Sequence, residues 1–226
     1  MNISIRNIEK SYGSRKRKKR ILKGLDLDAS GGDCIGIAGK NGCGKSTLLS
    51  VLAGVQKADS GSFSIDGHEL FSRPKDLSKN VGFVPQASAL MEELTAYDNL
   101  LMWYTKEEIG RQLNSGVLGL LGIGDFLRTR VRDLSGGMKK RLSIGCVMCT
   151  MPPVLLLDEP CAALDLECKE NIIGYIKDYV RKGGIAVLTS HDPMELEICS
   201  SHYVMKDGRL TPYAYNGNVD NLVASL

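Results

Sequence analysis

The strongest constraint on the fold of this chain is a glycine-rich segment, Gly39-Lys40-Asn41-Gly42-Cys43-Gly44-Lys45-Ser46-Thr47. It matches the pattern G-x-x-x-x-G-K-[ST], in which glycines allow successive backbone N–H groups to surround a phosphate. An apolar run at residues 33–38 predicts a strand before the segment, and residues 46–53 predict a helix after it. This order places a phosphate at a helix N-terminus, where partial positive charge is concentrated. The segment predicts a nucleoside triphosphate site, with Lys45 on the β- and γ-phosphates and the Ser46 hydroxyl on Mg²⁺.

A second segment supplies acidic groups for the same chemistry. The run Val154–Leu157 predicts a strand buried on both faces, and Asp158 and Glu159 follow at its carboxyl end. Open α/β sheets bind ligands at this end of their strands. Because successive strand residues point to opposite sides, the two carboxylates should differ in role. We expect Asp158 to hold the hydration shell of Mg²⁺ and Glu159 to act as general base on the attacking water.

The spacing between these two segments predicts the organisation of the chain. Lys45 and Asp158 are 113 positions apart, far more than one strand–helix–strand unit requires. Short strands are also predicted at residues 3–8, 22–27, 61–65, 80–84, 184–189, 203–205 and 208–210. Residues 87–150 carry helical spacing without strand patterns, and residues 171–181 predict an amphipathic helix. We therefore expect an α/β core interrupted by a helical insertion.

Composition and charge limit the class of protein. With 43% hydrophobic and 24% charged residues, the chain has the composition of a globular protein. No stretch approaches the ~18 consecutive apolar residues that span a bilayer, and residues 1–5 lack the apolar run of a secretory signal. Such a chain would reach a membrane only through a partner. The net charge of +3 comes mainly from the six cations Arg15–Arg20, which predict a solvated hairpin loop or, alternatively, a weak lipid or phosphate contact.

The seven cysteines show no regular framework, so we expect them to be reduced, as in a cytosolic chain. Cys146 and Cys149 form a C-x-x-C pair without the second pair that a zinc site needs, and buried thiols are the better interpretation. Inside the helical insertion, Leu134-Ser135-Gly136-Gly137-Met138 precedes a basic amphipathic helix. Taken alone, Ser-Gly-Gly is a helix N-cap, and its outward-facing N–H groups also make it a potential second phosphate site.

Together and in this order, the motifs resemble those of the ATP-binding cassette (ABC) ATPases of transporters, over essentially the whole chain. Residues 39–47 resemble the Walker A motif, residues 154–159 the Walker B motif and residues 134–138 the signature loop. The remaining similarities are Phe83-Val84-Pro85-Gln86 to the segment ending in the Q-loop glutamine, Ala163-Leu164-Asp165 to the D-loop, and Ser190-His191-Asp192 to the switch histidine. Tyr12 stands where the family places an aromatic side chain that stacks on adenine.

The resemblance implies a single ABC ATPase domain of the α/β class over residues 1–226. Residues 1–86 and 151–226 would form a P-loop NTPase (RecA-like) core with an N-terminal antiparallel β subdomain. Residues 87–150 would form an inserted α-helical subdomain.

The resemblance also implies the residues of a site that two cassettes share head to tail. The catalytic residues would be Lys45, Gln86, Glu159 and His191, and the metal-binding residues would be Ser46, Gln86 and Asp158. The nucleotide would contact Tyr12, Gly39, Lys40, Asn41, Gly42, Cys43, Gly44, Lys45, Ser46, Thr47, Gln86 and Asp158 of one chain, and Ser135, Gly136 and Gly137 in trans.

The implied function is Mg²⁺-dependent ATP hydrolysis by the energy-supplying subunit of a transporter. Leu94–Leu100 and Ser135–Ser143 most resemble bacterial export-type cassettes. The expected partners are a separate transmembrane permease and a second ABC ATPase domain, identical or not, with no nucleic acid. The expected location is cytoplasmic, on the inner face of the cell membrane through the permease.

Two alternatives stay open at this stage. Import is one, and a soluble ABC ATPase that acts on ribosomes or DNA is the other. The ABC ATPases that act as translation factors usually carry two cassettes, and those of DNA repair carry a long coiled coil. This sequence has neither feature. The basic run Arg15–Arg20 is the one feature that favours the soluble alternative. Glu159 and His191 argue against a cassette that binds ATP without turnover.

Overall fold

The structure of the chain is a computed structural model that describes residues 1–13, 17–87, 89–162, 164–215 and 217. Its strands are β1 (Asn2–Tyr12), β2 (Lys19–Ser30), β3 (Cys34–Ala38), β4 (Ser60–Ile65), β5 (His68–Glu69), β6 (Val81–Val84), β7 (Val154–Asp158), β8 (Ile185–Thr189), β9 (Ser201–Lys206) and β10 (Arg209–Tyr213). Its helices are α1 (Lys45–Leu52), α2 (Pro74–Asn80), α3 (Ala96–Leu100), α4 (Lys106–Ser115), α5 (Val117–Leu120), α6 (Gly136–Val147), α7 (Leu166–Arg181) and α8 (Pro193–Glu197). Three short 3₁₀ turns are η1 (Ile123–Phe126), η2 (Val131–Asp133) and η3 (Met148–Thr150).

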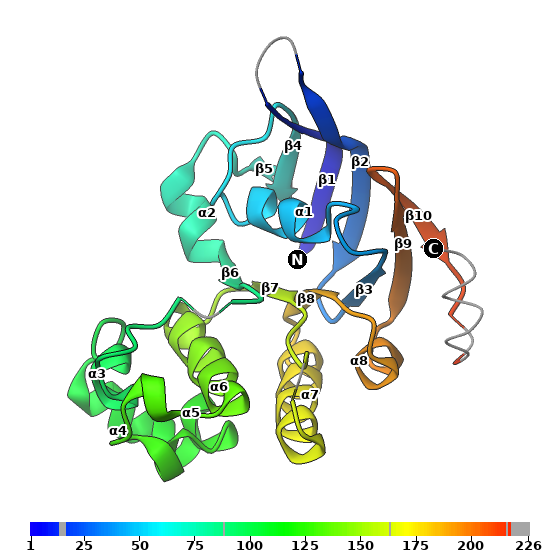
Figure 1. Ribbon diagram of the computed structural model, residues 1–226. Helices are drawn as coiled ribbons and strands as arrows, with labels where there is room; N and C mark the ends of the chain where they lie inside the picture. Colours follow the sequence, from blue (N-terminus) through cyan, green and yellow to red (C-terminus); the bar gives the residue numbers. More distant parts are fainter. Residues whose placement is uncertain (14–16, 88, 163, 216, 218–226) are drawn as a thin grey trace.

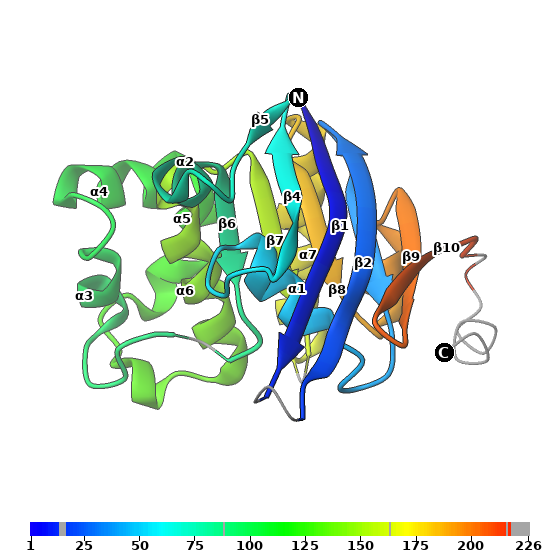
Figure 2. The same ribbon diagram turned by 90° about the horizontal axis from the view of Figure 1, so that it is seen from above.

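Two sheets carry the fold. The larger sheet has the order β10-β9-β3-β8-β7-β6, in which all neighbours pair in parallel except the β9–β10 hairpin. The smaller sheet has the order β2-β1-β4-β5 and is antiparallel. Figure 2 shows β1, β2 and β4 lying over α1, with the helices α3 to α6 to one side of both sheets. The expected α/β architecture with an N-terminal antiparallel sheet is confirmed.

The central strands are buried on both faces, as the continuous apolar runs predict. On β7, Val154 and Leu156 pack in a core with α1 and the smaller sheet. Leu155 and Leu157 point to the opposite face and pack in a second core with α6 and α7. This alternation follows from the two-residue period of a strand. The helical stretch therefore rests on the same sheet that carries the glycine-rich loop, although Figure 1 shows it gathered away from the smaller sheet.

Most predicted elements are present, with shifted boundaries. The predicted strand at residues 80–84 begins one residue later, because Asn80 is the last residue of α2. The predicted helix at residues 171–181 begins earlier, at Leu166, because the Asp165 side chain accepts a hydrogen bond from the Cys168 N–H and caps it. The sequence analysis did not predict α2, β5 or α8.

The described part of the basic run, residues 17–20, covers the end of the β1–β2 connection and the first two residues of β2. Lys18 pairs with Asp59 at 3.3 Å and Arg20 pairs with Glu9 at 2.5 Å, so two of its cations bind acids of the same sheet region. Arg15, Lys16 and, in the expected D-loop, Ala163 lie outside the described residues. All seven cysteines are free thiols; Cys146 is buried as expected, whereas Cys149 is only half-buried. Over the described ranges, no helix combines the length and the apolar character that crossing a membrane requires.

Candidate nucleotide-binding site

Four loops meet at one edge of the larger sheet. The strands β3, β8, β7 and β6 are neighbours and run in parallel, so their carboxyl ends lie together. The glycine-rich segment 39–47 follows β3, and His191 follows β8. Glu159 follows β7, and Gln86 follows β6. Residues that are far apart in the sequence therefore converge where open α/β sheets bind their ligands.

The glycine-rich loop turns tightly into α1. A Cβ atom on Gly39 would lie 2.6 Å from the carbonyl oxygen of Met205, so only glycine allows the loop to approach β9 this closely. Gly44, at φ 119, is the N-cap of α1, in a backbone conformation that side chains disfavour. The loop therefore leads directly into the N-terminus of α1, the arrangement that binds phosphate.

Lys45 is buried at 5% exposure and lies across this loop. Its Nζ donates to the Gly39 carbonyl oxygen at 2.5 Å and lies 3.1 Å from Nε2 of His191. Burial and the nearby Lys45 ammonium lower the pKa of His191 below its usual 6.5. The imidazole is therefore neutral at neutral pH, and its Nε2 accepts from Lys45.

The two acids at the end of β7, Asp158 and the following Glu159, differ in surroundings. Asp158 is buried, and its Oδ1 accepts a hydrogen bond from the Thr189 hydroxyl at 2.7 Å. Glu159 has a left-handed φ of 46°, and its N–H donates to the carbonyl and hydroxyl oxygens of Thr189, both at 3.1 Å. Gln86 Nε2 donates to Glu159 Oε2 at 2.8 Å. Strained backbone that neighbouring contacts hold in place is typical of functional sites.

A cavity of about 370 Å³ opens beside these groups. It is lined by Tyr12, Ile21, Asn41, Gly42, Gly44, Lys45, Ser46, Thr47, Gln86 and Glu159. His191 and Glu159 line a neighbouring cavity of about 340 Å³. Among the other predicted nucleotide contacts, Lys40 and Cys43 line a third cavity, which Asn41 and Gly42 share. Gly39 and Asp158 are buried behind the lining residues.

The donor set fits a magnesium nucleotide. The Ser46 hydroxyl and the Gln86 side-chain amide both line the cavity, and the Asp158 carboxylate lies buried at the end of β7. Mg²⁺ prefers oxygen ligands, retains several waters and is usually held by one or two protein oxygens plus phosphates. Ser46, Gln86 and Asp158 would therefore hold the ion, which would neutralise charge on the phosphates when bound.

The predicted signature residues do not line this cavity. Ser135 is the N-cap of α6, and its hydroxyl oxygen accepts from the Met138 N–H at 3.2 Å. A Cβ atom on Gly137 would lie 2.6 Å from Cys168 Sγ, so α6 packs closely against α7 there. Asp165 of the expected D-loop caps α7. The structure of one chain thus separates Ser135 to Gly137 from the glycine-rich loop.

Two supporting residues escaped the sequence analysis. Thr189 holds the Asp158 carboxylate and the Glu159 N–H, and its position at the end of a predicted strand was the available signal. Lys140 of α6 is buried, and its Nζ donates to the carbonyl oxygens of Pro85 and Gln86 at 2.9 and 3.1 Å. Burial lowers the pKa of Lys140. No local pattern predicts this contact, because it joins residues more than fifty positions apart.

Comparisons with known proteins agree with this geometry. A family model described as ABC transporter matches residues 22–162. The chain is 31% identical over 210 residues to the linearmycin resistance ATP-binding protein of Bacillus subtilis. The match covers 90% of this chain and 66% of the relative, so this chain spans slightly less than two thirds of the relative's length. It is 32% identical over 222 residues to the bacitracin export ATP-binding protein of Halalkalibacterium halodurans, covering 94% of this chain and 88% of the relative.

Relatives of opposite transport direction are similar to the same degree. The chain is 32% identical over 219 residues to the methionine import ATP-binding protein of Clostridioides difficile, covering 92% of this chain and 67% of the relative. Among solved structures, a dimeric post-hydrolysis ATP-binding cassette bound to ADP and Pi superposes with a TM-score of 0.82 at 27% identity, covering 93% of this chain and 97% of the other.

The Lys45–His191 contact gives a prediction for titration. The substitution Lys45→Met removes the nearby ammonium, one of the two causes that lower the pKa of His191. The pKa of His191 should therefore rise toward 6.5. Ring-proton NMR without added nucleotide measures it, and His191→Gln assigns the signal among the three histidines. The exposed Lys40→Met serves as the control and should leave the titration unchanged. A pKa of His191 that stays the same or falls in Lys45→Met contradicts the assignment.

The Lys140 contact gives a prediction for stability. Lys140→Met removes two charge-assisted hydrogen bonds to backbone carbonyls, so the free energy of unfolding should fall by about 2 kcal/mol. Urea denaturation followed by circular dichroism measures the change. Lys139→Met is the matched control on the same helix, because Lys139 pairs with the exposed Glu92 at 3.1 Å, and its loss should cost less than about 1 kcal/mol. Equal losses in the two variants would show that the Lys140 contact adds nothing specific.

Proposed function

The chain belongs to the ABC transporter family of ATPases, and on this premise we propose that it powers export through a separate membrane permease as one of two cassettes. The observation that carries the proposal is the convergence of the glycine-rich loop, Gln86, Glu159 and His191 at the carboxyl ends of four adjacent parallel strands. Hydrolysis of a nucleoside triphosphate requires such groups: a loop that binds the phosphates, a base and a histidine beside that base.

We assign the roles of these residues from their contacts. Lys45 would turn from the loop carbonyls to the β- and γ-phosphates, and Ser46, Gln86 and Asp158 would hold Mg²⁺. Glu159 would accept a proton from the attacking water, and its 2.8 Å contact with Gln86 fixes its carboxylate at the cavity. Once Lys45 has left His191, the neutral imidazole would carry its proton on Nε2 instead of Nδ1 and donate from Nε2 to the γ-phosphate. The exposed Tyr12 ring at the cavity rim would stack on adenine.

The position of the signature loop supports a shared site. Ser135 caps a twelve-residue helix whose N-terminus does not face the cavity of its own chain. A second chain facing this one head to tail would bring its own Ser135, Gly136 and Gly137 to the γ-phosphate. The related cassette that was solved with ADP and Pi is a dimer, which supports this arrangement. Residues 87–150 would then act as a helical subdomain that carries the signature loop, on a core of residues 1–86 and 151–226.

A surface of exposed apolar side chains on the segment that follows Gln86 supports docking to a permease. The exposed large apolar side chains of this surface, which we call the α3 patch, are Met91, Leu94, Leu101, Met102 and Trp103. They flank α3 on the chain segment that leaves Gln86, so a partner on this patch would sense the position of Gln86. Exposed apolar side chains gathered in one segment are typical of protein interaction sites.

Export is the direction that we propose, since the segments Leu94–Leu100 and Ser135–Ser143 are similar to those of export-type cassettes. The bacitracin export relative supports this direction, whereas the methionine import relative supports the alternative. Reconstitution with the permease in inside-out vesicles distinguishes them. External ATP should load the vesicle lumen with an exporter and empty it with an importer.

Glu159→Gln tests the proposed base. The amide keeps the size of the side chain but cannot accept the proton, so turnover should fall at least about 100-fold. ATP binding should persist, and light scattering should then detect a dimer in the presence of ATP. Glu170→Gln, an exposed acid on α7, should behave as wild type. Unchanged turnover in Glu159→Gln would show that another group is the base.

Trp103→Ala tests the α3 patch. Trp103 is the only tryptophan of the chain and is 61% exposed, so its fluorescence should shift to the blue when the permease covers it. The alanine variant should weaken permease binding by roughly tenfold or more while basal ATP hydrolysis stays unchanged. Val55→Ala, at a 68% exposed position after α1, should bind normally. An unshifted spectrum in the assembled complex would place the permease elsewhere.

A further inference from the structure

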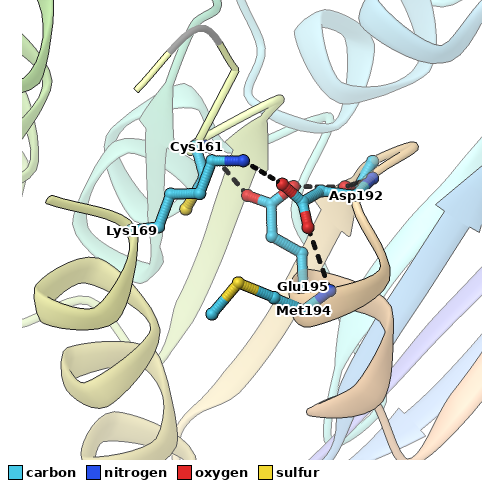
Figure 3. Close-up of polar contacts among 6 residues, drawn as sticks. Cys161, Lys169, Asp192, Met194 and Glu195 are labelled. Carbon is cyan, nitrogen blue, oxygen red and sulfur yellow. Dashed lines mark hydrogen bonds and ion pairs between the residues drawn. The ribbon is translucent and has the colours of Figure 1, made fainter. Parts of the chain in front are cut away.

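A buried carboxylate lies next to the switch histidine and has no role in the assignments above. Glu195, in the short helix α8, is only 2% exposed. Its Oε1 accepts a hydrogen bond from the Cys161 N–H at 2.9 Å, and its Oε2 accepts from the Ser190 hydroxyl. Figure 3 shows Glu195 between Cys161 on one side and Asp192 on the other.

The two donors belong to the two loops that carry the chemistry. Cys161 is two residues after Glu159, on the loop that follows β7. Ser190 directly precedes His191, on the loop that follows β8. One side chain therefore joins the backbone after the proposed base to the residue before the histidine.

A second contact holds the histidine loop from the same side. The Ser190 hydroxyl oxygen also accepts from the Asp192 N–H at 2.8 Å. The Asp192 carboxylate accepts from the Met194 N–H at 2.9 Å and pairs with Lys169 of α7, as Figure 3 shows. His191 thus lies between two residues whose polar groups are both fixed, while its own side chain contacts Lys45 of the site.

The burial of Glu195 needs a reason, because removing a carboxylate from water is costly unless hydrogen bonds compensate for the loss. Burial raises the pKa of Glu195 above its usual value, and the hydrogen bonds from Ser190 and Cys161 offset only part of that rise. Each carboxylate oxygen faces a donor. A glutamine at this position would present an NH₂ group to one of those donors, so it could keep only one of the two contacts as they stand.

We propose that Glu195 is a positioning residue that fixes His191 relative to Glu159 by holding both loops through Ser190 and Cys161. The proposal rests on the roles assigned above to Glu159 and His191. It predicts that Glu195 acts on the chemical step through the histidine rather than on nucleotide binding. Small displacements of reacting groups lower rates steeply, by as much as about 100-fold for ~1 Å.

Steady-state ATP hydrolysis by the full chain tests this role. Glu195→Gln should lower kcat by about tenfold or more while KM for ATP changes less than about twofold, as expected when only transition-state geometry is lost. In a His191→Ala background the same substitution should cost less than about twofold, because residues that act through one another are not additive. Glu197→Gln, an exposed glutamate on the same helix, is the control and should match the wild type.

A second readout separates positioning from simple loss of packing. Amide hydrogen exchange at Cys161 should be faster in Glu195→Ala, since its N–H loses the carboxylate acceptor, while the thermal unfolding midpoint shows whether the variant is folded. Should Glu195→Gln not fold, Ser190→Ala removes one of the two contacts and should show the same dependence on His191.

Additive losses with His191→Ala, or a raised KM with unchanged kcat, would overturn the proposal. Its failure differs from failure of the proposed function. If Glu159→Gln is inactive but the Glu195 and His191 effects are additive, only the positioning role is wrong. If Glu159→Gln retains full turnover, the assigned base is wrong instead.

Discussion

Backbone hydrogen bonding between β3, β8, β7 and β6 sets the spacing of the whole site, because neighbouring strands of a sheet lie only about 4.8 Å apart. The four strands are parallel, so each delivers its following loop to the same edge. After the helical stretch the chain returns to the sheet as β7, which pairs between β6 and β8. This position of β7 places Glu159 between Gln86 and His191. The proximity of these candidate catalytic residues, which come from distant sequence positions, depends on this strand order.

Side-chain contacts between the loops refine what the strand order provides. Thr189 of β8 holds Asp158, the last residue of β7, and the N–H of Glu159, which follows it. Lys45 from the β3 loop contacts His191 after β8. Lys45, Asp158 and Thr189 are buried, where an unsatisfied polar atom is costly. Each loop therefore satisfies the polar groups of its neighbour. The left-handed φ of Glu159 persists because the Glu159 N–H donates to two oxygens of Thr189.

The sequence predicts the parts of this arrangement that are local. The glycine-rich loop is recognisable because its glycines, Lys45 and Ser46 follow one another within a single strand–turn–helix unit. The end of β7 is recognisable because a run of apolar residues stops at two acids. Lys140 and Glu195 were missed because each binds backbone groups more than thirty positions away, and neither stands in a pattern that distinguishes it from a surface lysine or glutamate. Even α2 was missed, since Leu77 is its one buried residue and gives no periodicity.

A continuous series of contacts links the signature end of α6 to the proposed base. Ser135 caps the first turn of α6, and Lys140 lies on the following turn of the same helix. Lys140 holds the carbonyl oxygens of Pro85 and Gln86, and the Gln86 side chain holds Glu159. A helix transmits a displacement of its N-terminus along its length because its backbone is hydrogen-bonded throughout. Any partner that moves Ser135 would therefore act on Glu159 through Lys140 and Gln86. A second cassette that closes on the nucleotide could adjust the position of the proposed base by this route.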